Sequence, residues 1–421
     1  MLEDTHAVTD QAAPQATRSW TKWSIVFLLF LAMTLNYLDR QMIAVLKPLL
    51  SHDFRWSEAD YANIITAFQG AYAASYFLLG RLVDRFGAKV GFAVAFAIWS
   101  VAQIAHGFAR GLSGFMAART LLGLGEGGAY PAGLTAVAQW FPKSERAFAT
   151  GIFNAGVLVG AVVTPLIVPV LVLRFGWRAA FVATGIISFV WLLGWLFAYR
   201  TPGAVKLEKN EAVVQFHWSE ILRRKEAWAY GIAKFIIDPI FWMFLFWLPD
   251  FFAKRYGLDL KSFGPPLVVI YILADLGSFA GGWLSSHLIR RGLSTNDARK
   301  TAMLASALLA TPVVVAAQAQ TLWIAAGIVG LAAAAHQAFS VNLFTFPSDV
   351  FPQRAAGSVI GFGGMLGAIG GMLIAQFTGW VLGTFHTYGP LFALAASSYL
   401  VALLVIHLLS PKMEAVELSE A

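Results

Sequence analysis

Long apolar runs alternate with short polar breaks along almost the whole chain. A helix needs about 20 apolar residues to cross a bilayer, and twelve runs come close to or exceed that length. The breaks between them are rich in Gly, Pro and charged residues, which end helices or turn the chain. The pattern therefore predicts an all-α membrane protein with twelve transmembrane helices. The predicted spans are 21–46, 59–80, 89–107, 112–134, 146–172, 178–199, 228–252, 262–288, 300–316, 322–346, 355–379 and 387–409.

One polar break, at residues 200–227, is longer than the others and divides the spans into six and six. It carries charges of both signs, and we expect it to lie on the cytoplasmic surface as a short amphipathic helix and coil. The predicted parts of the chain are a cytoplasmic tail at 1–20, a six-helix bundle at 21–199, the linker at 200–227, a second six-helix bundle at 228–409 and a cytoplasmic tail at 410–421.

The two halves of the chain repeat the same local sequences. Phe141–Ala147 follows the fourth span, and the similar Phe351–Ala355 follows the tenth span 210 residues later. Gly80–Lys89 begins at the end of the second span, and a weaker copy that begins with Gly282–Ser286 starts near the end of the eighth. Matching sequences in matching loops predict two pseudo-symmetric six-helix bundles, related by an axis along the membrane normal.

Composition supports immersion in lipid and excludes several kinds of protein. Hydrophobic residues make up 58% of the 421 residues and charged residues 13%, whereas soluble proteins carry roughly 25% charged residues. The sequence has no cysteine, which excludes disulfides, thiolate metal sites and cysteine nucleophiles. It also lacks a Walker loop, a zinc-protease helix motif and a nucleophile-elbow motif. We expect a protein that is not an enzyme, has no metal or cofactor, and draws its energy from an ion gradient.

The positive charge is distributed unevenly between the two sides of the membrane. With the N-terminus in the cytoplasm, nineteen of the 30 Lys and Arg residues fall on the cytoplasmic side, eight on the opposite side and three within spans. Such an excess places both termini in the cytoplasm. The net charge of +7 therefore reflects topology, and we expect no nucleic-acid partner.

Seven Asp, Glu, Lys or Arg residues lie well inside the apolar spans, away from their ends. A charge at bilayer depth costs a few kcal/mol, so such residues are usually paired or face water. Four acids and three bases together indicate an aqueous cavity that handles charge, as in a channel or a transporter. The seven residues are Asp39, Arg40, Arg119, Glu126, Lys234, Asp238 and Asp275.

The first group of charges suits an organic anion. The helix rise places Asp39, Arg40 and Arg119 at similar depth, and Arg119 and Glu126 share one helix face. A guanidinium holds a carboxylate through two parallel hydrogen bonds, so either arginine could bind an acid; alternatively, Arg119 pairs permanently with Asp39. Polar groups that could bind the rest of such a ligand are Tyr37, Tyr72, Asn154, Gln337 and Asn342.

The acids of this group could carry protons. Burial favours the neutral form of a carboxyl group and a nearby arginine favours the charged form. Substrate binding to that arginine would therefore link proton uptake to substrate uptake at Asp39 and Glu126. The alternative is a structural role through backbone hydrogen bonds or pairing with Arg119.

The second half has its own polar residues. Lys234 and Asp238 are four residues apart on one helix and can pair, and Asp275 could complete a charged cluster. This group could contact the substrate. Alternatively, it could form a neutral network that stabilises a helix broken near Pro239. His336 either lines the cavity or is a hydrogen-bonded packing residue.

The decapeptide Gly80–Lys89 resembles the signature loop of the major facilitator superfamily at every defining position. This resemblance implies the fold of that superfamily and a gating role for Asp84, Arg85 and Arg146. Asp84 can face a helix N-terminus and Arg146, and would then hold the cytoplasmic side shut. A static loop anchor is the alternative.

A narrower resemblance covers nearly the whole chain. Asn36–Arg40, Arg119 with Glu126, and Trp140–Ala147 look like the anion:cation symporter family, which includes bacterial sugar-acid importers and sialin-like vesicular carriers. The resemblance implies that Arg40 binds the substrate carboxylate and that Asp39 and Glu126 titrate. Segments more specifically similar to hexuronate transporters are Lys234-Phe235, Asp238-Pro239, Ala274–Gly277, His336–Ala338 and Ser348–Phe351.

These features together predict a proton symporter of the bacterial inner membrane. We expect it to import a hexuronate such as galacturonate or glucuronate, as a monomer whose partners are an organic anion, protons and lipid. An aldonate such as galactonate, a tartrate or an aromatic acid could be the substrate instead, and sodium could replace the proton. A sensor that kept the fold is disfavoured, because the 200–227 linker is too short for a signalling domain.

Overall fold

The computed structural model of the chain describes residues 19–200 and 218–416. The predicted linker therefore falls mostly outside the described residues, at 201–217, and its described end is the short helix α6. The helices are α1 (Ser19–Phe54), α2 (Glu58–Phe108), α3 (Leu112–Glu126), α4 (Ala129–Trp140), α5 (Lys143–Ala198), α6 (Trp218–Arg223), α7 (Lys225–Tyr256), α8 (Gly264–Arg290), α9 (Thr295–Ala310), the 3-10 helix η1 (Thr311–Gln318), α10 (Leu322–Val350), α11 (Gln353–Phe385) and α12 (Gly389–Leu409).

These helices make twelve passes, as the sequence predicts. The long helices α2 and α5 each contain two passes, which turn at Gly87 (φ 80°) and Gly176 (φ 81°). Only glycine adopts this left-handed region without strain. The fourth pass is α3 followed by α4, and the ninth is α9 followed by η1.

By length and hydropathy alone, nine helical stretches in the described residues could cross a membrane. The difference from twelve has a simple cause. One stretch, Phe148–Ala198, holds parts of two passes. The first pass of α2 is more polar than the others, and α3 and α4, of 15 and 12 residues, are each short.

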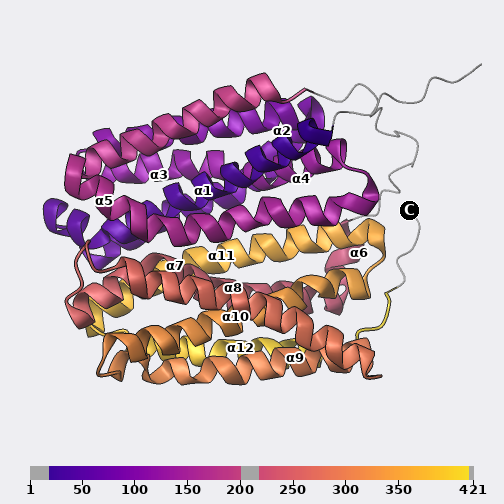
Figure 1. Cartoon of the computed structure of the whole chain (residues 1–421). Coiled ribbons are helices and arrows are strands. Elements are labelled where there is room, and N and C mark those ends of the chain that lie inside the picture. The colour runs from indigo at the N-terminus through magenta and orange to yellow at the C-terminus, as the bar shows by residue number, and fades with distance from the viewer. Residues whose placement is uncertain (1–18, 201–217, 417–421) are drawn as a thin grey trace, which may run out of the picture.

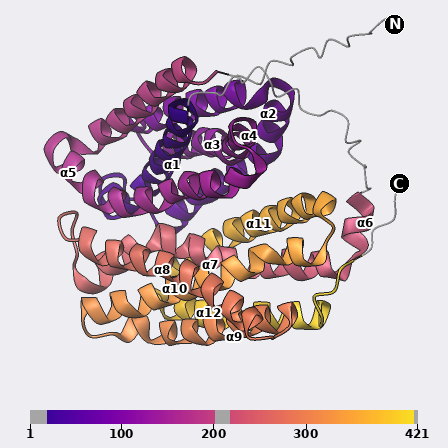
Figure 2. The ribbon, with the colours of Figure 1, turned by 45° about the vertical axis from the view of Figure 1, so that its right-hand side comes forward.

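The helices form two bodies that lie side by side with their axes roughly along one direction (Figure 1). We call α1–α5 the N-bundle and α7–α12 the C-bundle; Figure 2 shows the same separation from another side. The bundles meet where α2 packs on α11, α5 on α8 and α1 on α7. We call the end of the molecule where α1 begins and α12 ends the terminal face, and the opposite end the far face.

The pairing of helices repeats between the bundles. In the N-bundle, α1 packs on α5 and α2 on α3; in the C-bundle, α7 packs on α11 and α8 on α10. These are the same pairs of passes counted from the start of each bundle. The repeated loop sequences thus correspond to repeated packing.

Small residues allow the closest of these helix contacts. An added Cβ at Gly156 of α5 would lie 2.1 Å from the carbonyl oxygen of Phe30 in α1. At Gly277 of α8 it would lie 2.1 Å from the carbonyl oxygen of Ala334 in α10. Helix association in lipid depends on such close backbone approach, because lipid provides no hydrophobic drive between helices.

We expect Gly156→Ala to destabilise the protein, because its Cβ has no room beside the Phe30 backbone and the α1–α5 pair must move apart. The cost should be about 1–3 kcal/mol, typical of overpacking, and should appear as a lower thermal unfolding midpoint in detergent. Gly151→Ala on the same helix is the matched control, since nothing lies within 4 Å of its added Cβ. Equal midpoints for the two variants would contradict this packing argument.

Candidate functional site

Arg40 lies in the middle of α1 and is 4% exposed. Its Nε donates a hydrogen bond to Glu126 Oε2 of α3 at 2.8 Å, and its Nη2 donates to Asn36 Oδ1 at 3.0 Å. Asn36 is one helical turn before Arg40, so both face the same side of α1. The predicted arginine and one predicted proton-carrying acid are therefore in direct contact.

Four aromatic rings surround the guanidinium of Arg40. The ring centroids of Tyr72 and Tyr37 lie 4.7 and 5.0 Å from Cζ, and those of Phe68 and Trp242 lie at 5.5 Å. Cations are attracted to ring faces at such distances. Trp242 belongs to α7 of the C-bundle, and the other three rings belong to the N-bundle. Arg40 thus lies at the interface between the bundles.

Asp39 precedes Arg40 but faces the interior of the N-bundle. It is fully buried, and its Oδ2 accepts hydrogen bonds from Trp99 Nε1 at 2.7 Å and Ser188 Oγ at 3.2 Å. Its Oδ1 has no hydrogen-bond partner among the described residues. Adjacent residues of a helix point about 100° apart, which explains why these two have different neighbours.

Arg119 is fully buried behind Arg40. Its Nη1 donates to the backbone carbonyl of Arg40 at 3.2 Å, and its Cζ lies 5.7 Å from the ring of Phe68. Its Nε and Nη2, like Oε1 of Glu126, lack a hydrogen-bond partner in the described part of the chain. The described ion pairs do not include the permanent bridge between Arg119 and Asp39 that the sequence left open, and Asp39 is bound by Trp99 and Ser188 instead.

The predicted C-terminal cluster divides into a pair and a separate acid. Lys234 Nζ lies 2.7 Å from Asp238 Oδ2 and 4.1 Å from the centroid of the Phe344 ring. Asp275 of α8 is half-buried. No ion pair joins it to Lys234 among the described side chains. Asp275 is therefore separate from the Lys234–Asp238 pair.

The remaining predicted ligands lie in several places. His336 makes a 3.1 Å hydrogen bond through Nδ1 with the Tyr399 hydroxyl and stacks on Phe241 at 4.8 Å, the arrangement of a packing residue. Gln337 is half-buried on the next position of α10. Asn154 is half-buried on α5.

Asn342 is held near the terminal half of the C-bundle. It donates to the carbonyls of Ala338 and Gly281 at 2.9 and 3.1 Å, and accepts from Arg299 at 3.4 Å. Arg299 also binds Asp349 at 3.2 Å. The structure does not bring Asn342 together with Arg40. No group of three or more His, Asp or Glu side chains suited to a metal ion occurs in the described ranges.

The predicted gating residues lie near the terminal face. Arg146 donates to the carbonyls of Ala138 and Phe141 at 2.9 and 3.0 Å, and so ties the start of α5 to the end of α4. Arg85 is exposed, with its guanidinium 5.2 Å from the ring of Phe86. The side chain of Asp84 lies outside the described residues, so its predicted contact with Arg146 stays a prediction.

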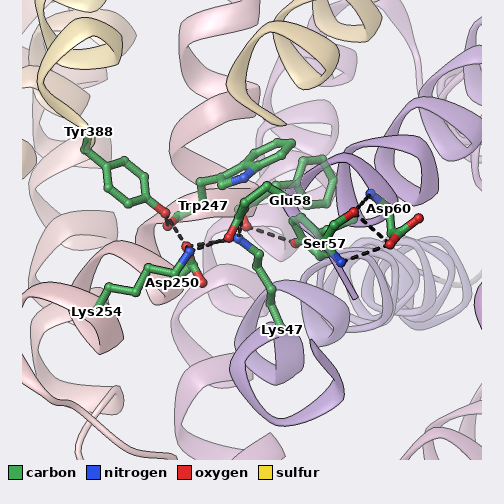
Figure 3. A network of polar contacts seen from close by, with 10 residues as sticks. Lys47, Ser57, Glu58, Asp60, Trp247, Asp250, Lys254 and Tyr388 are labelled. Carbon is green, nitrogen blue, oxygen red and sulfur yellow. Dashed lines mark hydrogen bonds and ion pairs between the residues drawn. The ribbon is translucent and has the colours of Figure 1, made fainter. Parts of the chain in front are cut away.

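Sequence reasoning missed a second charged site at the far face. Lys47, Glu58, Asp250 and Lys254 converge there from both bundles (Figure 3). The sequence prediction ended the first and seventh spans at 46 and 252, which placed both lysines in loops. The helices continue to Phe54 and Tyr256. The available signal was the pair Asp250 and Lys254, which share a helix face at i, i+4.

Comparison with known proteins agrees with this architecture. The family model for the Major Facilitator Superfamily matches residues 29–375. A hexuronate transporter of Escherichia coli K12 is 30% identical over 418 residues, covering 95% of this chain and 96% of the relative. A galacturonate transporter of Dickeya chrysanthemi is 30% identical, covering 62% of this chain and 81% of the relative.

A more distant relative and a solved structure extend the likeness. A D-galactonate transporter of Escherichia coli O6:H1 is 26% identical, with 86% and 89% of the two chains covered. The crystal structure of a bacterial homologue of the lysosomal transporter Spinster, described as inward-facing, has a TM-score of 0.72 at 20% identity, with 93% and 96% covered. Twelve passes in two similar bundles, a charged site at their interface and the match over most of the chain together show that this protein belongs to the major facilitator superfamily.

Proposed function

We propose that this transporter imports a hexuronate, such as galacturonate or glucuronate, together with protons by alternating access. The observation that carries the proposal is the ion pair between Arg40 and Glu126, enclosed by aromatic rings at the bundle interface. The names of the relatives support the substrate class, because hexuronate and galacturonate transporters are among the chains most similar to this one.

Arg40 is the residue we assign to the substrate carboxylate. Its planar donors match the two oxygens of a carboxylate, and its position between the bundles lets a bound ligand contact both. Tyr37 and Tyr72 lie against the guanidinium, where their hydroxyl groups could bind sugar hydroxyls. Trp242 of α7 is the residue through which the C-bundle would contact the same ligand.

Glu126 is the residue we assign to proton coupling. In the absence of substrate its carboxylate neutralises Arg40. A substrate carboxylate competes for the same guanidinium, and two carboxylates beside one buried arginine would leave excess negative charge. Protonation of Glu126 removes that excess, so substrate and proton bind together. Asp39, buried with Trp99 and Ser188, is our candidate for a second proton site.

We place the terminal face in the cytoplasm of a bacterium, in line with the distribution of Lys and Arg along the chain. The structure then has its outer side closed. Tyr61 of α2 donates to the carbonyl of Phe246 in α7 at 2.9 Å near the far face. Gln376 of α11 donates to Thr66 and Asn63 of α2 at 2.8 and 3.0 Å. An inward-facing state is the one we infer from these contacts.

Galactonate is the second candidate substrate, favoured by the 26% identical D-galactonate transporter. Uptake of labelled glucuronate in competition with galacturonate, galactonate and tartrate distinguishes the two proposals. A hexuronate carrier should be inhibited most strongly by galacturonate, and an aldonate carrier by galactonate.

Replacing Arg40 by Lys should lower the apparent affinity for glucuronate by at least about tenfold, because the charge is kept but the two-pronged hydrogen bond is lost. The measurement is KM for uptake into proteoliposomes. Arg110→Lys is the matched control, since Arg110 is exposed in the loop after α2. Normal uptake by the Arg40 variant would show that another group binds the carboxylate.

Glu126→Gln should preserve exchange of substrate across the membrane but reduce its accumulation by a proton gradient. Glutamine resembles the protonated acid and leaves Arg40 free for substrate, so counterflow of labelled for unlabelled glucuronate should persist. Accumulation driven by a proton gradient should fall at least about tenfold, because the side chain can no longer release a proton. Glu145→Gln is the control, since that acid pairs with Lys22 near the terminal face. Gradient-driven accumulation that survives in the Glu126 variant would refute its coupling role.

A further inference from the structure

Four charged side chains at the far face form a closed ring of alternating sign (Figure 3). Lys47 lies 2.7 Å from Glu58 and 2.9 Å from Asp250. Lys254 lies 2.9 Å from Asp250 and also binds Glu58. Each ion thus has two partners of opposite charge, and the ring as a whole is neutral. We call these four residues the far-face ring.

The ring is divided equally between the two bundles. Lys47 of α1 and Glu58 of α2 belong to the N-bundle, and Asp250 and Lys254 lie on α7 of the C-bundle. Two of its four contacts therefore stay within a bundle, Lys47–Glu58 and Lys254–Asp250. The other two, Lys47–Asp250 and Lys254–Glu58, cross the interface.

Two members of the ring are deeply buried. The side chain of Lys47 is 1% exposed and that of Asp250 is 4% exposed. Separating a buried ion from its sole partner is strongly unfavourable, because the ion is left uncompensated in a medium of low dielectric. In this ring, however, each ion that loses its partner across the interface still keeps a partner on its own bundle.

We propose that the far-face ring is the outer gate of the transporter, and that the gate opens by breaking only its two crossing contacts. In the open state each bundle then keeps one neutral ion pair, Lys47–Glu58 or Lys254–Asp250. The crossing contacts hold the far face closed, and the two internal contacts keep opening reversible. This device is additional to the proposed transport of a hexuronate and does not depend on which anion is carried.

Neighbouring groups fix the ring to its two bundles. The Tyr388 hydroxyl donates to Asp250 and holds that carboxylate on the C-bundle. The ring of Tyr61 lies 4.8 Å from Lys47 Nζ, and the Tyr61 hydroxyl reaches across to the Phe246 carbonyl of α7 at 2.9 Å. The residues beside the ring thus hold each pair in place and add one crossing hydrogen bond.

Inverting one internal pair tests the gate without removing any ion pair inside a bundle. The double variant K47E/E58K keeps the N-bundle pair with its signs exchanged, but both crossing contacts become repulsive. Like charges placed together across an interface are strongly unfavourable, so the ratio of open to closed far face should rise by about tenfold or more. D250K/K254D is the mirror variant on the C-bundle and should act the same way. The quadruple variant restores all four attractions and should close the gate again.

The opening is measured as a distance between spin labels. The sequence has no cysteine, so R110C and K261C provide the only thiols, on exposed far-face loops of different bundles. Both double variants should add a population at longer distance, and the quadruple variant should return to the original distribution. Inversion of the Lys22–Glu145 pair, which lies within the N-bundle, is the matched control and should change nothing.

Either of two results would overturn the proposal. One is a distance distribution in the double variants that matches the unaltered ring. The other is a quadruple variant that stays as open as the doubles, since the effect would then not come from the crossing contacts. The distances are recorded without substrate or proton gradient, on the monodisperse fraction of each variant. A negative result here therefore leaves the assignments of Arg40 and Glu126 untouched.

Discussion

The contact between Arg40 and Glu126 is the interaction on which the rest of the structure depends. A guanidinium at the middle of a membrane-spanning bundle is tolerated only with a counter-charge and hydrogen bonds close by. The carboxylate comes from α3, the amide of Asn36 from the preceding turn of α1, and the aromatic rings from both bundles. Satisfying this one charge therefore positions α1, α2, α3 and α7 relative to one another.

The packing of the helices allows that arrangement. Glycines such as Gly123 of α3, whose added Cβ would lie 2.3 Å from the Phe68 carbonyl of α2, bring neighbouring backbones close together. Close approach of α2 and α3 places Phe68 and Tyr72 beside the residues that α3 contributes. Substitutions at these glycines should therefore affect the site through helix position, without touching a ligand.

Much of this architecture could be predicted from the sequence. Twelve apolar runs predicted the twelve passes, and the repeated loops predicted the repeated helix pairs. The depth argument grouped Asp39, Arg40 and Arg119 because helix rise is regular, and the shared helix face with Arg119 added Glu126 to that group. Helix periodicity did not predict which neighbouring helix each buried side chain contacts. Asp39 and Arg119 share a depth, yet the first turns to Trp99 and the second to the backbone of Arg40.

The far-face ring shows a different limit of sequence reasoning. Lys47 lies just beyond the first apolar run and Asp250 lies near the end of the seventh, where hydropathy predicts that a helix leaves the membrane and a charge meets water. Both are nevertheless buried, because α1 and α7 continue past those points and lean on each other. Burial there is a property of the bundle interface. A single sequence, read one span at a time, does not contain that information.

The two charged sites differ in how completely their atoms are paired. At the central site, Arg119 Nε and Nη2, Glu126 Oε1 and Asp39 Oδ1 have no hydrogen-bond partner among the described residues. Unpaired buried polar atoms are costly, and a ligand or a proton can lower that cost. In the far-face ring each ion has two partners, so nothing is gained there by taking up a ligand. Chemistry that depends on binding suits the central site, and contacts that only need to break and re-form suit the ring.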